Sequence, residues 1–277
     1  MNKNGGVGDL YDRRFYGADE EACFAEDANI TDTPQTRHPA YQLAFRDEEF
    51  LLKPELRPVR FQLELLKPEM LLDQAGVGST LVMYGSARIP SPEDVDALRE
   101  SAAEKSEAEQ KTVERLIEKA KYYQEAYTLA RMATEKALIE DGERQFVVTT
   151  GGGPSIMEAG NRGASDAGGE SIGLNIVLPH EQAPNTYVTP YLSFQFHYFA
   201  LRKMHFLLRA KAVAVFPGGF GTFDEFFELL TLIQTGKMKA MPILLFGKDF
   251  WGRVINFEAL AEEGTISPRD LDLITWC

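Results

Sequence analysis

The sequence is poor in cysteine, with only Cys23 and Cys277 among its 277 residues. Two cysteines cannot build a disulfide scaffold, and no group of cysteines and histidines has the spacing of a zinc site. Basic residues are outnumbered as well, since 29 lysines and arginines stand against 42 aspartates and glutamates, a net charge of −13. A broad nucleic-acid surface needs a basic face, so that class of partner is excluded. A small anionic substrate is still allowed, because a local pocket can be positive in an acidic protein.

Long apolar runs are also missing. None approaches the roughly 20 residues that span a bilayer, and residues 1–19 lack the apolar core of a signal peptide. We therefore expect a globular protein of the cytoplasm, with no membrane partner and no metal site. The hydrophobic content of 44% is enough for one large domain, or for one domain with an appendage.

The common phosphate-binding fingerprints are absent too. Gly219-Phe220-Gly221 begins like the dinucleotide motif G-x-G-x-x-G, but Asp224 stands where the third glycine belongs. No G-x-x-x-x-G-K-[ST] sequence occurs. A mononucleotide fits this chain better than a dinucleotide does.

What is present divides the chain into three parts. Residues 1–39 are polar and turn-rich, which predicts an arm. Residues 40–78 alternate apolar clusters with prolines, which predicts an N-terminal extension of short helices. We favour a packing or dimer-contact role for this extension over a catalytic one. Residues 79–277 form the third part.

Residues 79–277 alternate short apolar strands with helices. This pattern predicts an α/β fold, a Rossmann-like doubly wound parallel sheet with helices on both faces and ligands at the carboxyl ends of the strands. The helical pattern over 92–140 is too long for one helix and predicts a break near 106–112. The expected strands are 79–84, 146–150, 171–177, 212–216 and 243–246, and the other expected helices are 156–167, 198–210, 223–235 and 250–262.

Three of the expected strands end in glycine. Glycine permits a sharp turn and the close approach of a ligand to the main chain, and the N-terminus of the next helix suits a phosphate. Tight turns also need glycine when nothing binds, but three such turns at one sheet edge favour an anion site. The candidate residues are Gly85, Ser86, Gly151, Gly152, Gly153, Gly218, Gly219, Gly221 and Thr222.

Glu225 is the candidate acid. It lies three residues after Thr222, so this pair matches a capping box, as do Ser155 and Glu158. A helix cap is therefore the alternative for each glutamate. Glu225, however, directly follows the proposed phosphate site. A carboxylate near the anomeric carbon can stabilise the positive charge that ribosyl hydrolysis builds, and can activate water.

Arg202 and Lys203 form a charged pair in the otherwise apolar stretch 199–206. A buried charge needs a partner, which a substrate phosphate or Glu225 would supply. The planar fork of Arg202 suits either partner. The alternative is that both side chains extend to solvent.

These residues resemble the LOG family of phosphoribohydrolases, whose members were often misnamed lysine decarboxylases. PGGFGTFDE at 217–225 matches the family signature PGGxGTxxE, Arg202-Lys203 matches the RK pair ahead of it, and residues 84–86 and 151–158 resemble its first and second glycine turns. The resemblance covers roughly 79–262. It implies that Glu225 and Arg202 are catalytic, and that the glycine turns with Met157, Glu158, Lys203 and Thr222 bind the substrate.

The implied substrate is a nucleoside 5′-monophosphate, hydrolysed to a free base and ribose 5-phosphate without a metal or cofactor. Phe199-Ala200 stand where plant-like members carry Met-His, as in the longer bacterial branch. AMP or another purine monophosphate is therefore as well supported as a cytokinin riboside monophosphate. The resemblance also implies a homodimer or higher homo-oligomer.

A role in assembly, with residues 40–74 as the interaction surface, and a non-catalytic binding function are the alternatives to this activity. A non-catalytic nucleotide-binding or sensor protein of the same fold would use the same turns, with Glu225 as a cap only. Lysine decarboxylation has no support in the sequence, which offers no clear site for a pyridoxal phosphate Schiff base.

Overall fold

The computed structural model describes Ala18, Ala22 and residues 30–179 and 183–277. The polar arm expected over 1–39 lies mostly outside these residues. The chain divides into two compact units, residues 1–60 and 61–277. In the first unit, the described elements are η1 (Pro39–Tyr41), η2 (Ala44–Arg46), α3 (Glu48–Leu51), η3 (Pro54–Leu56) and the start of α4.

Helix α4 runs from Arg57 to Gln74 and contains Pro68 in its interior. The expectation that prolines limit this region to short helices is therefore wrong here. Pro58 lies in the first turn, where a missing N–H is tolerated. Pro68 and Leu72 are buried, and most helical stability comes from the packing of an apolar face. That packing offsets the hydrogen bond that Pro68 removes.

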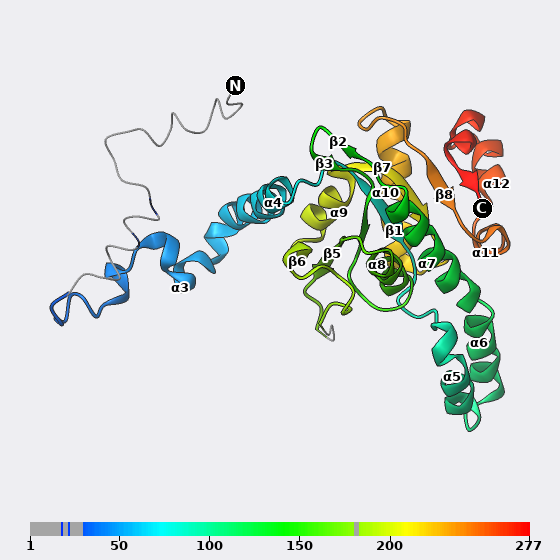
Figure 1. Ribbon diagram of the computed structural model, residues 1–277, viewed down its shortest axis with the longest axis horizontal. Coiled ribbons are helices and arrows are strands. Elements are labelled where there is room, and N and C mark those ends of the chain that lie inside the picture. The colour runs from blue at the N-terminus through cyan, green and yellow to red at the C-terminus, as the bar shows by residue number, and fades with distance from the viewer. Residues whose placement is uncertain (1–17, 19–21, 23–29, 180–182) are drawn as a thin grey trace. The chain divides into compact units, whose positions relative to one another are not determined.

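A seven-stranded sheet forms the centre of the second unit, and every pairing in it is parallel. Its order is β6-β5-β4-β1-β7-β8-β9 (Figure 1). This confirms the predicted doubly wound parallel sheet, because the chain builds outward from β1 in one direction and then in the other. The strands are β1 (Thr80–Tyr84), β4 (Val147–Thr150), β5 (Ser171–Ile176), β6 (Ser193–Phe196), β7 (Ala210–Val215), β8 (Ile243–Leu245) and β9 (Thr275–Trp276).

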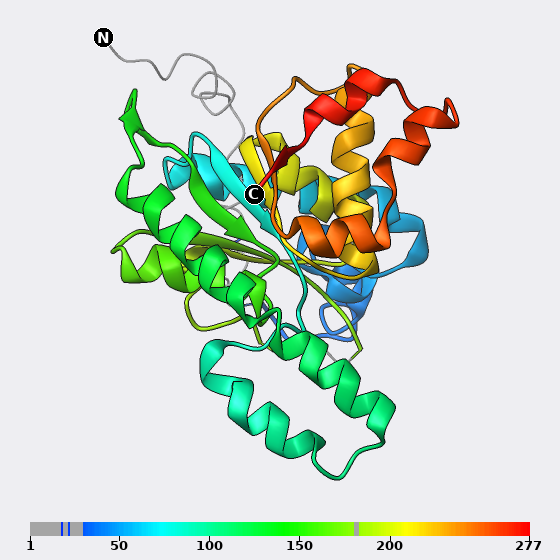
Figure 2. The ribbon, with the colours of Figure 1, turned by 90° about the vertical axis from the view of Figure 1, so that its right-hand side faces the viewer.

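Helices cover both faces of this sheet (Figure 2). Side chains alternate across a strand, so Leu81 and Met83 of β1 join the core beneath α7 and α8, whereas Val82 and Tyr84 join the core beneath α9 and α10. The helices of the second unit after α4 are α5 (Val95–Ala102), α6 (Glu107–Ile117), α7 (Ala120–Glu135), α8 (Ile156–Asp166), α9 (Phe199–Leu208), α10 (Phe220–Gln234), α11 (Lys248–Val254) and α12 (Phe257–Glu262).

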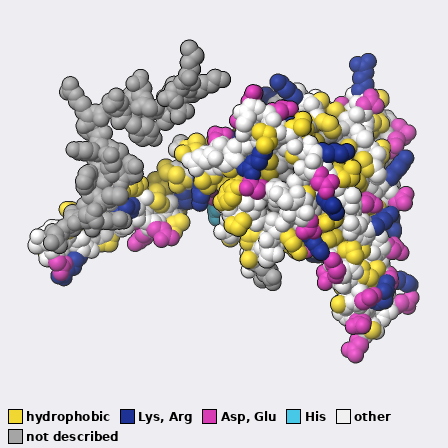
Figure 3. All heavy atoms as spheres, viewed as in Figure 1, with side chains coloured by type: hydrophobic (Ala, Val, Ile, Leu, Met, Phe, Trp, Pro, Cys, Tyr) yellow, Lys and Arg dark blue, Asp and Glu magenta, His cyan; other side chains and the backbone are white. Residues whose placement is uncertain are grey.

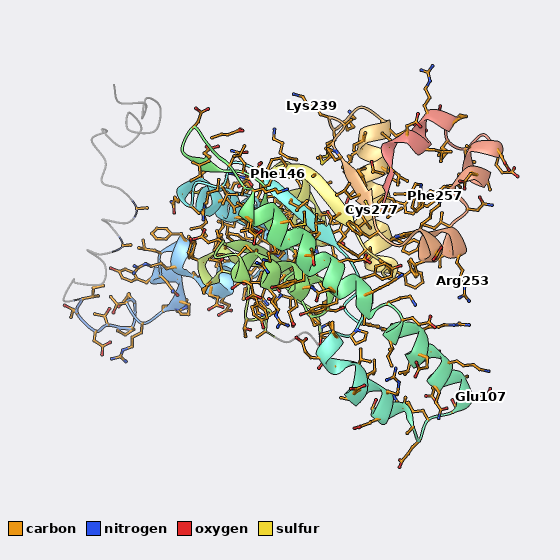
Figure 4. The ribbon with its side chains drawn as sticks, turned by 45° about the vertical axis from the view of Figure 1, so that its right-hand side comes forward. Glu107, Phe146, Lys239, Arg253, Phe257 and Cys277 are labelled. Carbon is orange, nitrogen blue, oxygen red and sulfur yellow. The ribbon has the colours of Figure 1, made fainter. Side chains whose placement is uncertain are left out.

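The helical pattern over 92–140 breaks earlier than expected. Ser106 caps α6 through a capping box with Glu109, so the first break spans 103–106 and meets the expected range only at its start. A second break, at 118–119, separates α6 from α7. Helices α5 and α6 form a hairpin that projects from the domain, with Glu107 at its far end (Figures 2 and 4). A helix to residue 140 is also wrong. Asp141 and Gly142, with φ of 52° and 85°, form the left-handed turn typical of a two-residue hairpin between β2 (Ile139–Glu140) and β3 (Glu143–Arg144).

Three smaller differences complete the comparison. The helix expected at 250–262 is two helices, α11 and α12, and the edge strands β6 and β9 were not expected. None of the helices within the described residues has the length and apolar character needed to cross a membrane. On the face of the domain drawn in Figure 3, acidic and basic side chains are interspersed.

Candidate functional site

The three glycine turns meet at one edge of the sheet. They follow β4, β1 and β7, which are neighbouring strands. The N–H of Ser86 donates to the carbonyl of Pro217 at 3.1 Å, and the N–H of Ile156 donates to the carbonyl of Ser86 at 3.4 Å. The strand order reverses on either side of β1, and ligands of doubly wound sheets bind in the crevice at such a switch point.

The glycines of these turns differ in what the fold demands of them. Gly152 has a φ of +72°, and a Cβ on Gly85 would lie 2.5 Å from Ile156 Cγ2. The fold itself therefore requires glycine at both positions. Among the described residues, none has an atom within 4 Å of a Cβ placed on Gly219 or Gly221. These two glycines leave open space beside the start of α10.

The start of α10 has no side-chain cap. Its N-cap is Gly219, so Thr222 is the third residue of the helix, and Glu225 does not form a capping box with it. Ser155 likewise makes no side-chain cap bond to α8, and its hydroxyl donates instead to the carbonyl of Ile89 at 2.5 Å. The capping-box alternative is therefore wrong for both glutamates. Helix α10 presents its first N–H groups, at the positive end of its dipole, to the open space.

Arg202 and Glu225 form an ion pair beneath this edge. Arg202 Nη1 lies 3.2 Å from Glu225 Oε1, and the exposed fractions of the two side chains are 11% and 14%. The guanidinium of Arg202 also donates from Nε to the carbonyl of Leu174 at 2.6 Å and lies 5.0 Å from the ring centroid of Phe206. A Cβ on Gly151 would lie 2.6 Å from Arg202 Nη2, so the second glycine turn touches this pair.

Burial raises the pKa of Glu225 to about 7, because the ionised carboxylate loses hydration. The charge of Arg202 acts in the opposite direction, and the charge of Asp224 adds to the rise. Near neutral pH the carboxyl group is therefore close to half ionised. A carboxyl group poised in this way can take up or release a proton, which is typical of functional sites.

Lys203 makes a different set of contacts. Its ammonium lies 3.1 Å from carboxylate oxygens of Asp224 and Glu228, and its side chain is 19% exposed. Burial acts to lower the pKa of Lys203, but the hydrogen bonds to the two carboxylates together raise it. Lys203 therefore pairs across α9 and α10 without contacting Glu225, and its contact with substrate stays a prediction.

Three other predicted contacts border the glycine turns. Thr222 is buried and lies against Gly218. Met157 Cε would meet a Cβ on Gly153 at 2.8 Å. The carboxylate of Glu158 accepts a hydrogen bond from the hydroxyl of Tyr123 in α7 at 2.9 Å, so α7 already engages one of its oxygens.

Two asparagines brace the second glycine turn, and the sequence did not point to either of them. Asn185 Nδ2 donates to the carbonyls of Gly152 and Gly153 at 3.1 and 3.0 Å. It also donates to Asn161 Oδ1, which accepts from the hydroxyl of Thr150 at 2.7 Å. Asn161 could have been noticed in the sequence, because it is a polar amide in the middle of a buried helix. No sequence pattern points to Asn185.

Two cavities lie near this site. A hollow of about 500 Å³ lies beside the carboxyl end of β5 and along β6, lined by Asn175, Phe194 and Gln195 among others. A larger groove of about 700 Å³ lies between α9, α10 and residues 237–242. Lys203 and Glu228 line its near wall, and Lys239, which points outward in Figure 4, lies at its far side. The groove is lined by none of the glycine turns.

Comparison with known proteins gives one family match. Residues 157–277 match the family described as "Possible lysine decarboxylase". This span begins in α8 and includes Arg202 and Glu225. A comparison with curated protein sequences gave no match.

Two solved structures are among those similar to parts of this chain. The molybdenum cofactor binding protein from the phototrophic bacterium Rippkaea orientalis is 19% identical, with 56% of this chain and 79% of that chain covered and a TM-score of 0.39. The Moco carrier protein from Chlamydomonas reinhardtii is 18% identical, with 72% and 89% covered and a TM-score of 0.39. The family match therefore covers the C-terminal part of the α/β domain, from α8 to Cys277.

Proposed function

We propose that this protein is a phosphoribohydrolase that cleaves the N-glycosidic bond of AMP or a related purine or cytokinin riboside 5′-monophosphate. The products are a free base and ribose 5-phosphate. The observation that carries the proposal is the buried Arg202–Glu225 pair, which lies beside an uncapped helix N-terminus and three glycine turns.

The phosphate binds at the turns that follow β1, β4 and β7. The first N–H groups of α10 and the dipole of that helix supply the attraction, and Gly219 and Gly221 leave the room. The hydroxyl of Thr222 adds a donor. Net negative charge elsewhere on the chain does not prevent this, because the contacts are local.

The ribose then lies over Glu225. As the bond from C1′ to the base nitrogen breaks, positive charge builds on the sugar ring, and the ionised carboxylate stabilises it. Water adds its oxygen to C1′ and gives a proton to Glu225, while the departing base keeps the bonding electrons and takes up a proton from solvent. Glu225 then releases its proton to solvent, which restores the ionised carboxylate. Arg202 keeps part of the Glu225 population ionised and holds the carboxylate in place.

The base occupies the hollow beside β5 and β6. Its volume of about 500 Å³ is in the range of small-molecule sites. Asn175 and Gln195 carry carboxamides, which donate and accept hydrogen bonds and so suit the edge of a heterocycle. By family resemblance, we also propose that the protein acts in the cytoplasm as a homodimer or higher homo-oligomer, which its mass in solution would test.

A product screen tests the proposed activity. Purified protein is incubated with AMP, GMP, a cytokinin riboside monophosphate and adenosine, and free base is measured by chromatography. We expect base release from at least one monophosphate and little from adenosine, which lacks the phosphate. Saturable nucleotide binding by calorimetry without any base release would instead identify a non-catalytic binding protein.

A further inference from the structure

Helix α4 packs along α9, the helix that carries Arg202 and Lys203. From Phe61 onward the two helices lie within one compact unit. Contacts occur at both ends of α9, from Glu64 near its start to Asp73 near its end. Helix α4 lies ahead of the span that matches the family, so this support comes from outside the matched region.

Glu64 supplies the acceptors at the start of α9. Its Oε1 accepts from the N–H of His197 at 2.9 Å, and its Oε2 accepts from the N–H of Tyr198 at 3.2 Å. Tyr198 is the N-cap of α9 and makes no side-chain cap bond of its own. A carboxylate at the positive end of a helix dipole is favourable. The ring of Phe61 packs edge-on against the ring of Tyr198, with centroids 4.1 Å apart.

A second anchor holds the other end of α9. Arg209 Nη2 lies 2.9 Å from Glu69 Oε2 and 2.6 Å from Asp73 Oδ1. Between the two anchors, the buried ring of His205 places Nε2 3.1 Å from the carbonyl of Glu64. Helix α9 is therefore restrained against sliding along its axis and against rotation.

One helical turn of α9 separates Tyr198, whose N–H donates to Glu64, from Arg202 of the candidate catalytic pair. The carbonyl of Tyr198 accepts from the N–H of Arg202 at 3.1 Å. The Arg202 side chain must then reach both the carbonyl of Leu174 and Glu225. Hydrogen bonds weaken steeply with distance and angle, so a small slip of α9 would break one of these contacts.

We propose that Glu64 is a positioning residue for the Arg202–Glu225 pair, acting by fixing the start of α9. This inference rests on the proposed function for its kinetic consequence only. Its structural consequence, the placement of Arg202 beside Glu225, is measurable whether or not the protein is an enzyme.

The first measurement uses kinetics. Glu64→Ala should lower kcat/KM for the best monophosphate by about tenfold to hundredfold, because misplacement by about 1 Å costs on this order. The loss should fall on kcat more than on KM, since the phosphate turns are unchanged. Glu64→Gln keeps one side-chain acceptor and should recover part of the loss. Gln62→Ala, at an exposed position of the same helix, is the matched control and should leave kcat/KM unchanged.

The second measurement is independent of turnover. The pKa of the Glu225 carboxyl group is measured by carbon-13 NMR. Hydrogen exchange of the backbone amides of residues 197–203 is measured on the same proteins. In Glu64→Gln, and in Glu64→Ala where it folds, the pKa of Glu225 should rise because Arg202 no longer lies close to it. An unchanged Glu225 pKa in these variants would overturn the positioning role. If the wild-type protein releases no base, the proposed function is wrong. The pKa of Glu225 in the Glu64 variants then still decides whether Glu64 positions Arg202.

Discussion

Arg202 Nη1 lies 3.2 Å from Glu225 Oε1, at a site where both side chains are largely buried. The guanidinium stays charged at all accessible pH values, so the protonation of Glu225 alone decides whether the pair is neutral overall or positive. A catalytic carboxylate and a structural one at this position would respond differently to substitution and to pH.

Glu225→Gln tests the role of the charge with little change in size. We expect base release to fall by about 10²–10⁴-fold, the usual contribution of an acid–base group. Nucleotide binding should be largely retained, because the phosphate turns do not depend on Glu225. Chromatography of the released base and calorimetry with AMP measure the two quantities. Glu258→Gln, an exposed glutamate of α12, is the control, and full turnover by Glu225→Gln would exclude the assigned mechanism.

The dependence of activity on pH follows from the pKa of Glu225, which is about 7. Because the ionised form acts, kcat/KM should rise with pH up to about 7 and level off above it. Arg202 lowers this pKa, so Arg202→Met should move the rising limb to higher pH and also reduce the plateau. A pH series with wild type and Arg202→Met measures both effects. If the rising limb of the pH profile lies at the same pH in Arg202→Met as in wild type, Arg202 does not lower the pKa of Glu225.

The stability of the fold should depend on the same titration. The pKa of Glu225 is raised from an ordinary value of 4.5 to about 7 in the folded protein. The folded state therefore binds the proton more tightly than the unfolded state does. The contribution of Glu225 to stability is complete below pH 4.5 and is lost as pH rises to 7.

Urea unfolding of wild type and Glu225→Gln across this range isolates that contribution. Glutamine does not titrate, so the difference in unfolding free energy between the two proteins should shift against the wild type as pH rises from 4.5 to 7. Above 7 the difference should be constant. Two curves that run parallel over the whole range would show that burial does not raise this pKa.

The strand-to-helix pattern was enough to predict the sheet and the meeting of the glycine turns. Parallel strands place their carboxyl ends at one edge whatever their order, so the turns after β1, β4 and β7 had to share an edge. Strands β6 and β9 were not predicted. Strand β9 has only two residues, and β6 alternates polar and apolar residues (SFQF), so neither forms the short apolar run by which the other strands were recognised.

The contacts within the site were harder to predict. From the residue types alone, the partner of Arg202 and Lys203 could be either Glu225 or a substrate phosphate. In the structure, Arg202 pairs with Glu225, whereas Lys203 pairs with Asp224 and Glu228. Which carboxylate each cation meets depends on the rotation of α10 against α9, which tertiary packing decides. The bond from Glu64 to the start of α9 spans 133 residues of sequence, and no local pattern encodes it.

Gly221→Ala separates a ligand site from a structural turn. Gly221 is the second residue of α10, and a Cβ there would meet nothing within 4 Å. Alanine also suits a helix better than glycine by up to about 1 kcal/mol, so the melting temperature should stay unchanged or rise. If the start of α10 holds a phosphate, the added methyl group would push it away from the helix N–H groups, and KM should rise by about tenfold.

Gly152→Ala provides the contrast. Its φ of +72° is strained for alanine, and the new Cβ would lie 2.5 Å from Asn175 Oδ1. This variant should therefore lose stability, by roughly 1 kcal/mol or more, whether or not a ligand binds. Thermal melts and steady-state kinetics on both variants test the distinction. A Gly221→Ala protein with an unchanged KM would mean that no phosphate lies at the start of α10, since no atom of the described residues lies within 4 Å of the added methyl group.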